Sequence, residues 1–198
     1  MMILKYLLIA VIGYLLGSIS TGILYSRTLG QDIRTQGSKN AGATNMARVH
    51  GISKGLITLL GDSLKGVLAT LIGLWIAGQT GAMIGGAAAA IGHMWPVFFG
   101  FKGGKGVATL LGVGLVIDPP VLLIALAIAV LTIVLTKYVS LGSMVGVTAF
   151  TIGVIISKGF WPVGLWAAAL SALSCWRHRT NIQRLLKGTE NKFSISKK

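Results

Sequence analysis

The sequence predicts an all-helical, polytopic membrane protein with seven transmembrane helices, its N-terminus outside the cell and its C-terminus in the cytoplasm. The first observation is composition: 54% of the 198 residues are hydrophobic and only 11% are charged, whereas about a quarter of the residues in soluble domains are charged. The second is the recurrence of long apolar stretches, and the third is the gathering of basic residues between them. No linker-like segment divides the chain, so we expect one integral membrane domain over residues 1–198.

The first apolar stretch resembles a secretory signal, because Lys5 precedes an apolar run that ends in small residues at 17–20. We expect it to be retained as a membrane span. A crossing needs about 20 apolar residues, and the fourth candidate, with 11 residues, is either a short span or half of a re-entrant pair. Seven spans is therefore the prediction and five the alternative. The candidate spans are 2–25, 55–77, 81–98, 107–117, 121–136, 141–156 and 160–176.

The distribution of cations sets the orientation, because Lys and Arg in short loops stay on the cytoplasmic side. With the N-terminus outside, the inner segments hold 15 of the 18 Lys and Arg, and only Lys5, Lys65 and Lys158 lie elsewhere. Seven helices is the count that places the long basic segments on one side. The inner segments are 26–54, 99–106, 137–140 and 177–198.

The net charge of +14 indicates anionic partners. Because the cations are interleaved with apolar runs, a membrane surface or anionic substrates explain the charge better than nucleic acid. The single cysteine, Cys175, excludes an intrachain disulfide and a multi-cysteine metal site. Three scattered histidines and four acids make no credible metal cluster, so no metal or cofactor is expected.

The first polar segment, 37–48, is rich in small residues. Its glycines let the backbone approach a ligand closely and expose N–H groups to an anion. Short hydrogen-bonding side chains and the fixed charge of Arg48 would also contact the anion. The alternative is a solvated turn that caps a helix.

The second polar segment, 93–109, surrounds Lys105 with glycines at the entrance to a predicted helix. Helix N-termini suit phosphate, and Lys105 would act as a point charge on it. Gly106 follows Lys105 where a nucleotide P-loop has Gly-Lys-Ser/Thr, which argues against an ATPase. Lys102 either contacts the phosphate or only anchors the chain at the membrane interface. His93 is either functional or a helix-end histidine whose hydrogen bonds are satisfied within the protein.

The third polar segment, 177–190, is basic and predicted to be helical, so that His178 and Asn181 share a face. Histidine exchanges protons near neutral pH. Glu190 is the only glutamate, and we expect it to be a structural partner of an arginine. Within the second span, Asp62 and Lys65 are also three residues apart and are expected to pair or to line a polar cavity.

Two catalytic signatures are absent from the sequence. There is no Gly-x-Ser-x-Gly elbow, and no histidine is followed five positions later by the aspartate of many glycerolipid acyltransferases. A reaction here would need a histidine base or a base carried by the substrate.

With these three segments in this order, the sequence resembles the bacterial acyl-phosphate:glycerol-3-phosphate acyltransferase family over nearly the whole chain. The resemblance is carried by residues 37–45, by 92–109 with its Phe-Lys-Gly-Gly-Lys-Gly core, and by 178–182 with Gly-Thr-Glu at 188–190. Lys39 stands where many members have glycine. The resemblance implies transfer of a fatty acyl group from acyl phosphate to the 1-hydroxyl of glycerol-3-phosphate, giving 1-acyl-glycerol-3-phosphate (lysophosphatidic acid) and phosphate. It also implies a multi-pass protein of the bacterial inner membrane with a cytoplasmic active site.

The resemblance further implies roles for single residues. Catalysis would fall to His178, Asn181, Lys105 and Ser38, with either His178 or the donor phosphate as the base. Glycerol-3-phosphate would be bound by Lys105, His178, Asn181, Arg48 and Ser143, the last in the short loop between the fifth and sixth spans. Arg48 would also assist at the acyl-phosphate head. The acyl phosphate would be cradled by Gly37, Ser38, Asn40, Ala41, Gly42, Ala43, Thr44, Asn45, Gly103 and Gly104.

Two other classes of function remain as alternatives. A transporter of phosphate esters would favour internal repeats and charges near mid-membrane, whereas this chain has no convincing repeat and gathers its polar groups on one face. A membrane scaffold would not need three anion-binding loops. We expect membrane lipid as surroundings and no nucleic-acid partner, and the sequence leaves the oligomeric state and the acyl-chain preference open.

Overall fold

The computed structural model describes residues 1–193, and all regular elements in this range are helical. The chain divides into two compact units, Met1–Ile117 and Asp118–Lys198, which are treated separately below. A single domain over the whole chain stays a prediction. The all-helical membrane class is confirmed, because long apolar helices dominate both units.

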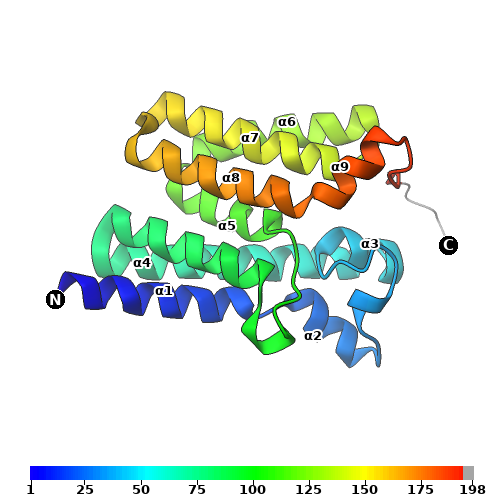
Figure 1. The fold of residues 1–198 in the computed structure, drawn as a ribbon, viewed down its shortest axis with the longest axis horizontal. Helices are drawn as coiled ribbons and strands as arrows, with labels where there is room; N and C mark the ends of the chain where they lie inside the picture. Colours follow the sequence, from blue (N-terminus) through cyan, green and yellow to red (C-terminus); the bar gives the residue numbers. More distant parts are fainter. Residues whose placement is uncertain (194–198) are drawn as a thin grey trace. The chain divides into compact units, whose positions relative to one another are not determined.

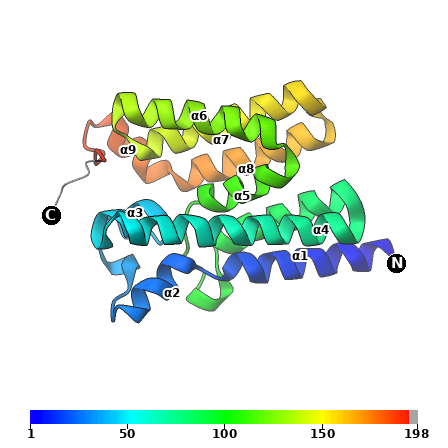
Figure 2. The ribbon, with the colours of Figure 1, turned by 180° about the vertical axis from the view of Figure 1, so that it is seen from behind.

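The first unit is built around a long folded-back helix. In order, its elements are α1 (Met2–Ser18), α2 (Thr21–Thr28), the short helix η1 (Ile33–Thr35), α3 (Ala43–His50), α4 (Ile52–Met94), η2 (Val97–Phe99) and α5 (Val107–Ile117). Figures 1 and 2 show α1 lying alongside α4.

Helix α4 consists of two arms that run in opposite directions. The helix is interrupted at Ala77 and Gly78, where Gly78 adopts φ +61°. After this turn the arms pack so closely that a Cβ on Gly73 would collide with the carbonyl of Gly81. The two arms correspond to the predicted spans 55–77 and 81–98, which were therefore correctly separated.

Small residues let the helices of the first unit approach one another. A Cβ on Gly17 of α1 would collide with the backbone of Ala89 in α4, and one on Gly112 of α5 would collide with the carbonyl of Ser63. In lipid, where apolar surface gains nothing by leaving its solvent, such close contact is a main source of helix association.

The predicted first span, 2–25, is wrong as a continuous helix. Ile19 and Ser20 are extended, so α1 ends at Ser18 and α2 begins at Thr21. The break leaves backbone groups without partners inside a helix, and two buried side chains of α4 form hydrogen bonds with them. Lys65 Nζ donates to the Ile19 carbonyl at 2.7 Å, and the Thr21 N–H donates to Asp62 at 3.3 Å. The predicted pairing of Asp62 with Lys65 is confirmed, at 2.9 Å.

The second unit contains α6 (Pro119–Thr136), α7 (Val139–Lys158), the single π-helical turn η3 (Phe160–Gly164), α8 (Leu165–Arg177) and α9 (Arg179–Leu186). Helix α7 packs against both α6 and α8. The predicted last span began at residue 160, but α8 begins at Leu165. Pro162 forces extended backbone on Trp161, which is why the regular helix starts later.

The chain after α9 returns to the start of α7. The Phe193 N–H donates to the Lys137 carbonyl at 2.8 Å, and the ammonium of Lys192 lies 5.9 Å from the centre of the Tyr138 ring. Ser140 donates to Glu190 at 2.7 Å. The segment 190–193 is thereby fastened across the first turn of α7.

Within residues 1–193, four stretches are long and apolar enough to cross a membrane: Met2–Thr28, Ile52–Phe99, Pro119–Thr136 and Val139–Lys158. The second of these contains both arms of α4, and Val107–Ile117 is a shorter apolar helix. The seven predicted segments thus correspond to α1, the two arms of α4, and α5 to α8. The orientation in the membrane stays a prediction.

Candidate functional site

The first polar segment is folded around the side chain of Asn45. Its Nδ2 donates to the carbonyls of Ile33, Gln36 and Asn40 at 2.9–3.2 Å, and its Oδ1 accepts from the N–H of Ser38 at 2.8 Å. Asn45 is buried, and so it holds the loop in shape from within. Contact between Asn45 and a ligand stays a prediction.

The loop bends tightly on the way to α3. Gly37 and Lys39 both have positive φ, at +55° and +58°. A Cβ on Gly37 would collide with Asn45, so only glycine fits there. Lys39 adopts a conformation that glycine accepts at no cost and that other residues adopt less readily.

An apolar base supports this loop, and the predicted ligand-binding side chains lie at its surface. Ile23, Ile33, Ala41 and Met46 form a buried cluster beneath it. Ser38 and Arg48 are exposed, whereas Asn40, Gly42, Ala43 and Thr44 are half-buried. The segment therefore presents hydroxyl and guanidinium groups outward on a rigid support.

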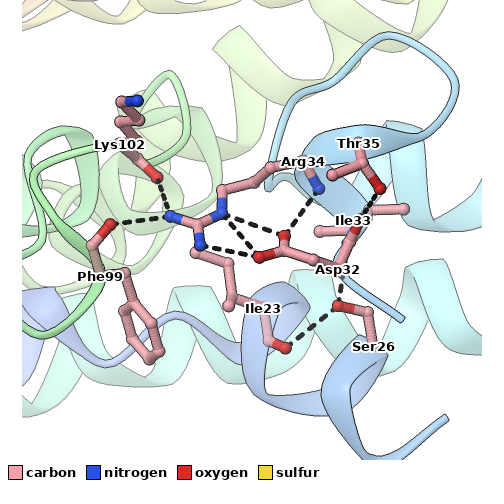
Figure 3. Close-up of polar contacts among 8 residues, drawn as sticks. All are labelled: Ile23, Ser26, Asp32, Ile33, Arg34, Thr35, Phe99 and Lys102. Carbon is pink, nitrogen blue, oxygen red and sulfur yellow. Dashed lines mark hydrogen bonds and ion pairs between the residues drawn. The ribbon is translucent and has the colours of Figure 1, made fainter. Parts of the chain in front are cut away.

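Arg34, which lies in η1 just before the first polar segment, connects this region to the second polar segment, a role that sequence reasoning missed (Figure 3). Its guanidinium forms a two-pronged ion pair with Asp32, at 3.0 Å from Nε to Oδ1 and 2.7 Å from Nη2 to Oδ2. Its Nη1 donates to the carbonyl of Phe99 at 2.7 Å, and the Lys102 carbonyl is 3.4 Å away. The two segments are therefore clamped together within the first unit.

The electrostatics of Asp32 reflect this clamp. The hydrogen bond from Arg34 lowers the pKa of Asp32 below its ordinary value, against the raising effect of partial burial. Asp32 also caps η1 by accepting the N–H of Arg34 at 2.9 Å. The sequence did contain a signal for this ion pair: Asp32 and Arg34 are two residues apart, and the chain has only four acids.

The glycine-rich loop of the second segment runs from η2 to α5. Gly100, Phe101 and Gly106 have positive φ, which turns the chain before the helix. Helix α5 begins at Val107, two residues after Lys105, as predicted. Lys105 is half-buried, and Gly103 and Gly104 pack too closely on the end of α4 to carry side chains.

The third polar segment lies in the second unit, at the junction of α8 and α9. His178 follows the last residue of α8, and its Nδ1 is 2.8 Å from the Ser174 carbonyl. A carbonyl only accepts, so Nδ1 carries a hydrogen, and whenever the ring is neutral Nε2 is its acceptor nitrogen. Asn181 is in the first turn of α9, and its N–H donates to the His178 carbonyl at 2.8 Å. That the two side chains share a face of one helix stays a prediction.

A carboxylate network orients Asn181. Asn181 Nδ2 donates to Glu190 Oε1 at 2.6 Å, the same oxygen accepts from Ser140, and Arg184 Nε donates to Oε2 at 2.6 Å. The predicted pairing of Glu190 with an arginine is confirmed. Burial acts to raise the pKa of Glu190, but the hydrogen bonds from Asn181, Arg184 and Ser140 outweigh it and lower the pKa.

The predicted location of Ser143 in a loop is wrong. Helix α7 begins at Val139, so Ser143 lies in its second turn, because the chain after Tyr138 is already helical. Lys105 and Arg48 belong to the first unit, whereas His178, Asn181 and Ser143 belong to the second. Their convergence at one pocket stays a prediction. Among residues 1–193, no group of three or more His, Cys, Asp or Glu is placed to hold a metal ion.

The chain matches known sequences over almost its whole length. A family model described as glycerol-3-phosphate acyltransferase matches residues 7–188. A glycerol-3-phosphate acyltransferase of Clostridioides difficile (strain 630) is 48% identical over 205 residues, covering 100% of both chains. Another, from Thermoanaerobacter pseudethanolicus, is 49% identical over 190 residues, covering 94% of each.

The fold is also similar to that of two crystal structures of PlsY (YgiH), described as an integral membrane glycerol 3-phosphate acyltransferase. One is its glycerol 3-phosphate form, with a TM-score of 0.92, and the other its lysophosphatidic acid form, with a TM-score of 0.88. Each is 38% identical and covers 96% of both chains. These similarities extend across both units.

Proposed function

Because the chain belongs to the glycerol-3-phosphate acyltransferase family, we propose that it transfers a fatty acyl group to the 1-hydroxyl of glycerol-3-phosphate, giving lysophosphatidic acid. The observation that carries this proposal is the structural match to PlsY in its glycerol 3-phosphate and lysophosphatidic acid forms, over 96% of the chain. These two forms correspond to the acceptor and the product of the reaction.

The donor in this proposal is an acyl phosphate. Each of the four acids of the sequence is held in an ion pair: Asp32 with Arg34, Asp62 with Lys65, Asp118 with Lys158, and Glu190 with Arg184. A carboxylate engaged in this way is a poor proton acceptor, because protonation would break its pair. An acyl phosphate supplies both the activated acyl group and a phosphate that can take the proton.

The reaction then balances without a cofactor. The oxygen of the 1-hydroxyl attacks the acyl carbon, the bond from that carbon to the phosphate oxygen breaks, and inorganic phosphate leaves with the hydroxyl proton. His178 would accept the hydrogen bond of the hydroxyl through Nε2, because Nδ1 is engaged by Ser174. Asn181, held by Glu190, would orient the same acceptor molecule.

The cations of this chain would offset the repulsion between two phosphorylated substrates. Two such molecules bring about four negative charges together, and like charges repel strongly at low dielectric. Lys105 and Arg48 would hold the glycerol-phosphate, and the loop 37–45, with Ser38 and the neighbouring N–H groups, would hold the acyl-phosphate head together with Gly103 and Gly104. Holding both reactants in line removes several kcal/mol of barrier, roughly 7–11 in the best cases.

We place this site at the cytoplasmic side of the bacterial inner membrane. Of the 18 Lys and Arg, 15 lie in the predicted inner segments, which contain the two glycine-rich loops and the pair His178 and Asn181, and cationic segments stay inside. The acyl chain of the donor would lie among the apolar helices, many of whose leucines and isoleucines are exposed.

The test is turnover by the purified protein in lipid vesicles or detergent. With acyl phosphate supplied, release of inorganic phosphate should depend on glycerol-3-phosphate, and lysophosphatidic acid should accumulate in equal amount. Formation of lysophosphatidic acid from acyl-CoA but not from acyl phosphate would contradict the donor. Accumulation of glycerol-3-phosphate inside vesicles without turnover would instead support the transporter alternative.

A further inference from the structure

A buried cluster of three titratable side chains lies in the first unit. Asp62, Lys65 and His93 are 0%, 5% and 2% exposed. Lys65 Nζ lies 2.9 Å from Asp62 Oδ1, and His93 Nδ1 lies 3.7 Å from the same oxygen. A buried charge is costly unless it is paired, so Asp62 and Lys65 stabilise one another.

Part of this cluster has a structural explanation. Lys65 and Asp62 satisfy the Ile19 carbonyl and the Thr21 N–H at the break between α1 and α2. That function needs one cation and one anion. It gives no reason for the third group, His93, which lies at the end of the second arm of α4.

His93 connects the cluster to the glycine-rich loop. The Gly104 N–H donates to the His93 carbonyl at 3.1 Å. A Cβ on Gly104 would overlap the imidazole at Nε2, Cε1 and Cδ2, and one on Gly103 would overlap the His93 carbonyl oxygen. The imidazole therefore packs directly against the backbone that precedes Lys105.

The need for glycine at position 104 comes from this ring. Gly104 is not among the residues with positive φ, so its backbone conformation is open to any residue. What excludes a side chain is the imidazole, whose Nδ1 faces Asp62. The position of the loop is thus set by the position of the His93 ring.

We propose that His93 is a positioning residue for Lys105. Asp62 holds the imidazole, the imidazole fixes the backbone at residues 103–104, and this backbone aims the Lys105 ammonium at the phosphate of glycerol-3-phosphate. The inference rests on the proposed function, in which Lys105 binds that phosphate. Because lysine has a long flexible side chain, the cost of ordering it depends on where its backbone is held.

The experiment compares His93→Gln with wild type in steady-state kinetics, with the two substrates varied separately. Misplacement of Lys105 should raise the KM for glycerol-3-phosphate by about tenfold to a hundredfold. His50→Gln is the matched control, because His50 lies at the end of α3, outside this cluster. It should behave as wild type in both measurements.

A double-mutant cycle separates positioning from a general structural effect. If His93 acts through Lys105, His93→Gln should add nothing to the defect of Lys105→Ala. Gly104→Ala, which places a methyl group against the imidazole and keeps both Asp62 and Lys65, should also raise the KM for glycerol-3-phosphate, and it decides the matter if His93→Gln does not fold. An unchanged KM for glycerol-3-phosphate in the folded variant, or effects of His93→Gln and Lys105→Ala that multiply, would overturn the proposal.

Calorimetric titration with glycerol-3-phosphate distinguishes failure of this inference from failure of the proposed function. If the wild type binds this compound but forms no lysophosphatidic acid, acyl transfer is refuted. The comparison of Kd between His93→Gln and His50→Gln then still decides the role of His93. If the wild type does not bind it, both proposals fall together.

Discussion

The amide nitrogen of Asn181 donates to the Glu190 carboxylate at 2.6 Å, in the second unit of the molecule. The donation fixes which end of the amide faces the carboxylate, and so it directs Oδ1 the other way. Ser140 and Arg184 hold the carboxylate from two further sides. A residue proposed to orient the acceptor substrate is thus itself oriented by the only glutamate in the chain.

Glu190→Gln should therefore weaken binding of glycerol-3-phosphate. Both oxygens of Glu190 accept hydrogen bonds, whereas the glutamine side chain has one oxygen and one NH₂ group. The NH₂ group would face a donor, so either Asn181 or Arg184 would lose its acceptor. A loss of about 1–3 kcal/mol, typical of a broken buried hydrogen bond, would raise the KM for glycerol-3-phosphate roughly fivefold or more. Asp118→Asn, which removes the ion pair with Lys158 but keeps a helix cap, is the control. An equal effect of the two substitutions on KM would contradict the positioning role of Glu190.

The same network should appear in the pH dependence of stability. The pKa of Glu190 is lower in the folded protein than its ordinary value of 4.5. Its contribution to stability is therefore complete above pH 4.5 and is lost as the pH falls through the folded-state value. Thermal unfolding in detergent should show wild type losing more stability than Glu190→Gln below pH 4.5. Parallel curves for the two proteins would show that the network contributes nothing.

Arg34→Lys should loosen the connection between the first two polar segments. Lysine keeps the charge but not the planar fork that reaches both Asp32 and the Phe99 carbonyl. We expect a loss of about 1–2 kcal/mol in unfolding free energy and a lower kcat/KM. Arg27→Lys is a suitable control, since the Arg27 guanidinium lies over the face of the Phe99 ring, where lysine can make the same contact, and lysine keeps the charge that acts on Asp32. Equal behaviour of both variants would argue against the clamp.

Gly17→Ala should destabilise the first unit. The new methyl group would collide with the backbone of Ala89, which has no rotamer to change. Overpacking of this kind costs about 1–3 kcal/mol. In Gly146→Ala the methyl meets chiefly the Ala129 side chain, so the loss should be smaller. Thermal unfolding in detergent measures both, and equal losses would show that the approach of α1 to α4 is not as rigid as described.

His178→Gln should lower kcat by about a hundredfold and remove a limb of the pH–rate profile near neutral pH. Glutamine can occupy a similar volume, but it does not titrate. Lysophosphatidic acid formation measured from pH 5 to pH 9 tests this. Full activity with an unchanged profile would exclude any direct role for the histidine.

Accessibility labelling should establish the orientation in the membrane. In a Cys175→Ser background, single cysteines at Gln79 and Pro120 should react with a membrane-impermeant maleimide on spheroplasts. Cysteines at Lys39, Lys102 and Arg179 should react only after the membrane is opened. Labelling of Lys102 and Arg179 from opposite faces would rule out a shared pocket for Lys105 and His178.

The sequence predicted the spans well because hydropathy is a local property. Residues 107–117 and the end of α6 at Thr136 agree with the structure to the residue. The pairing of Asp62 with Lys65 was also accessible, because three residues on a helix bring two side chains together. Reasoning from neighbouring residues therefore predicted single helices and contacts within one helix.

The errors arise where the structure depends on distant partners. The break at Ile19 is stabilised by Lys65, 46 positions away, and the clamp by Arg34 reaches Phe99, 65 positions away. The four hydrogen bonds between the Asn45 side chain and backbone groups at residues 33–40 were likewise not predicted, whereas its contact with a ligand stays a prediction. No pattern within one segment reveals such partners.

The return of the chain after α9 has a practical consequence for cloning. Residues 190–193 add no helix and would look dispensable in a secondary-structure diagram, so an expression plasmid could reasonably stop at Gly188. Such a truncation would remove Glu190 and the Phe193 hydrogen bond to Lys137 together. The shortened enzyme would still insert and still show a full helical spectrum, while its Asn181 amide would have lost the carboxylate that orients it.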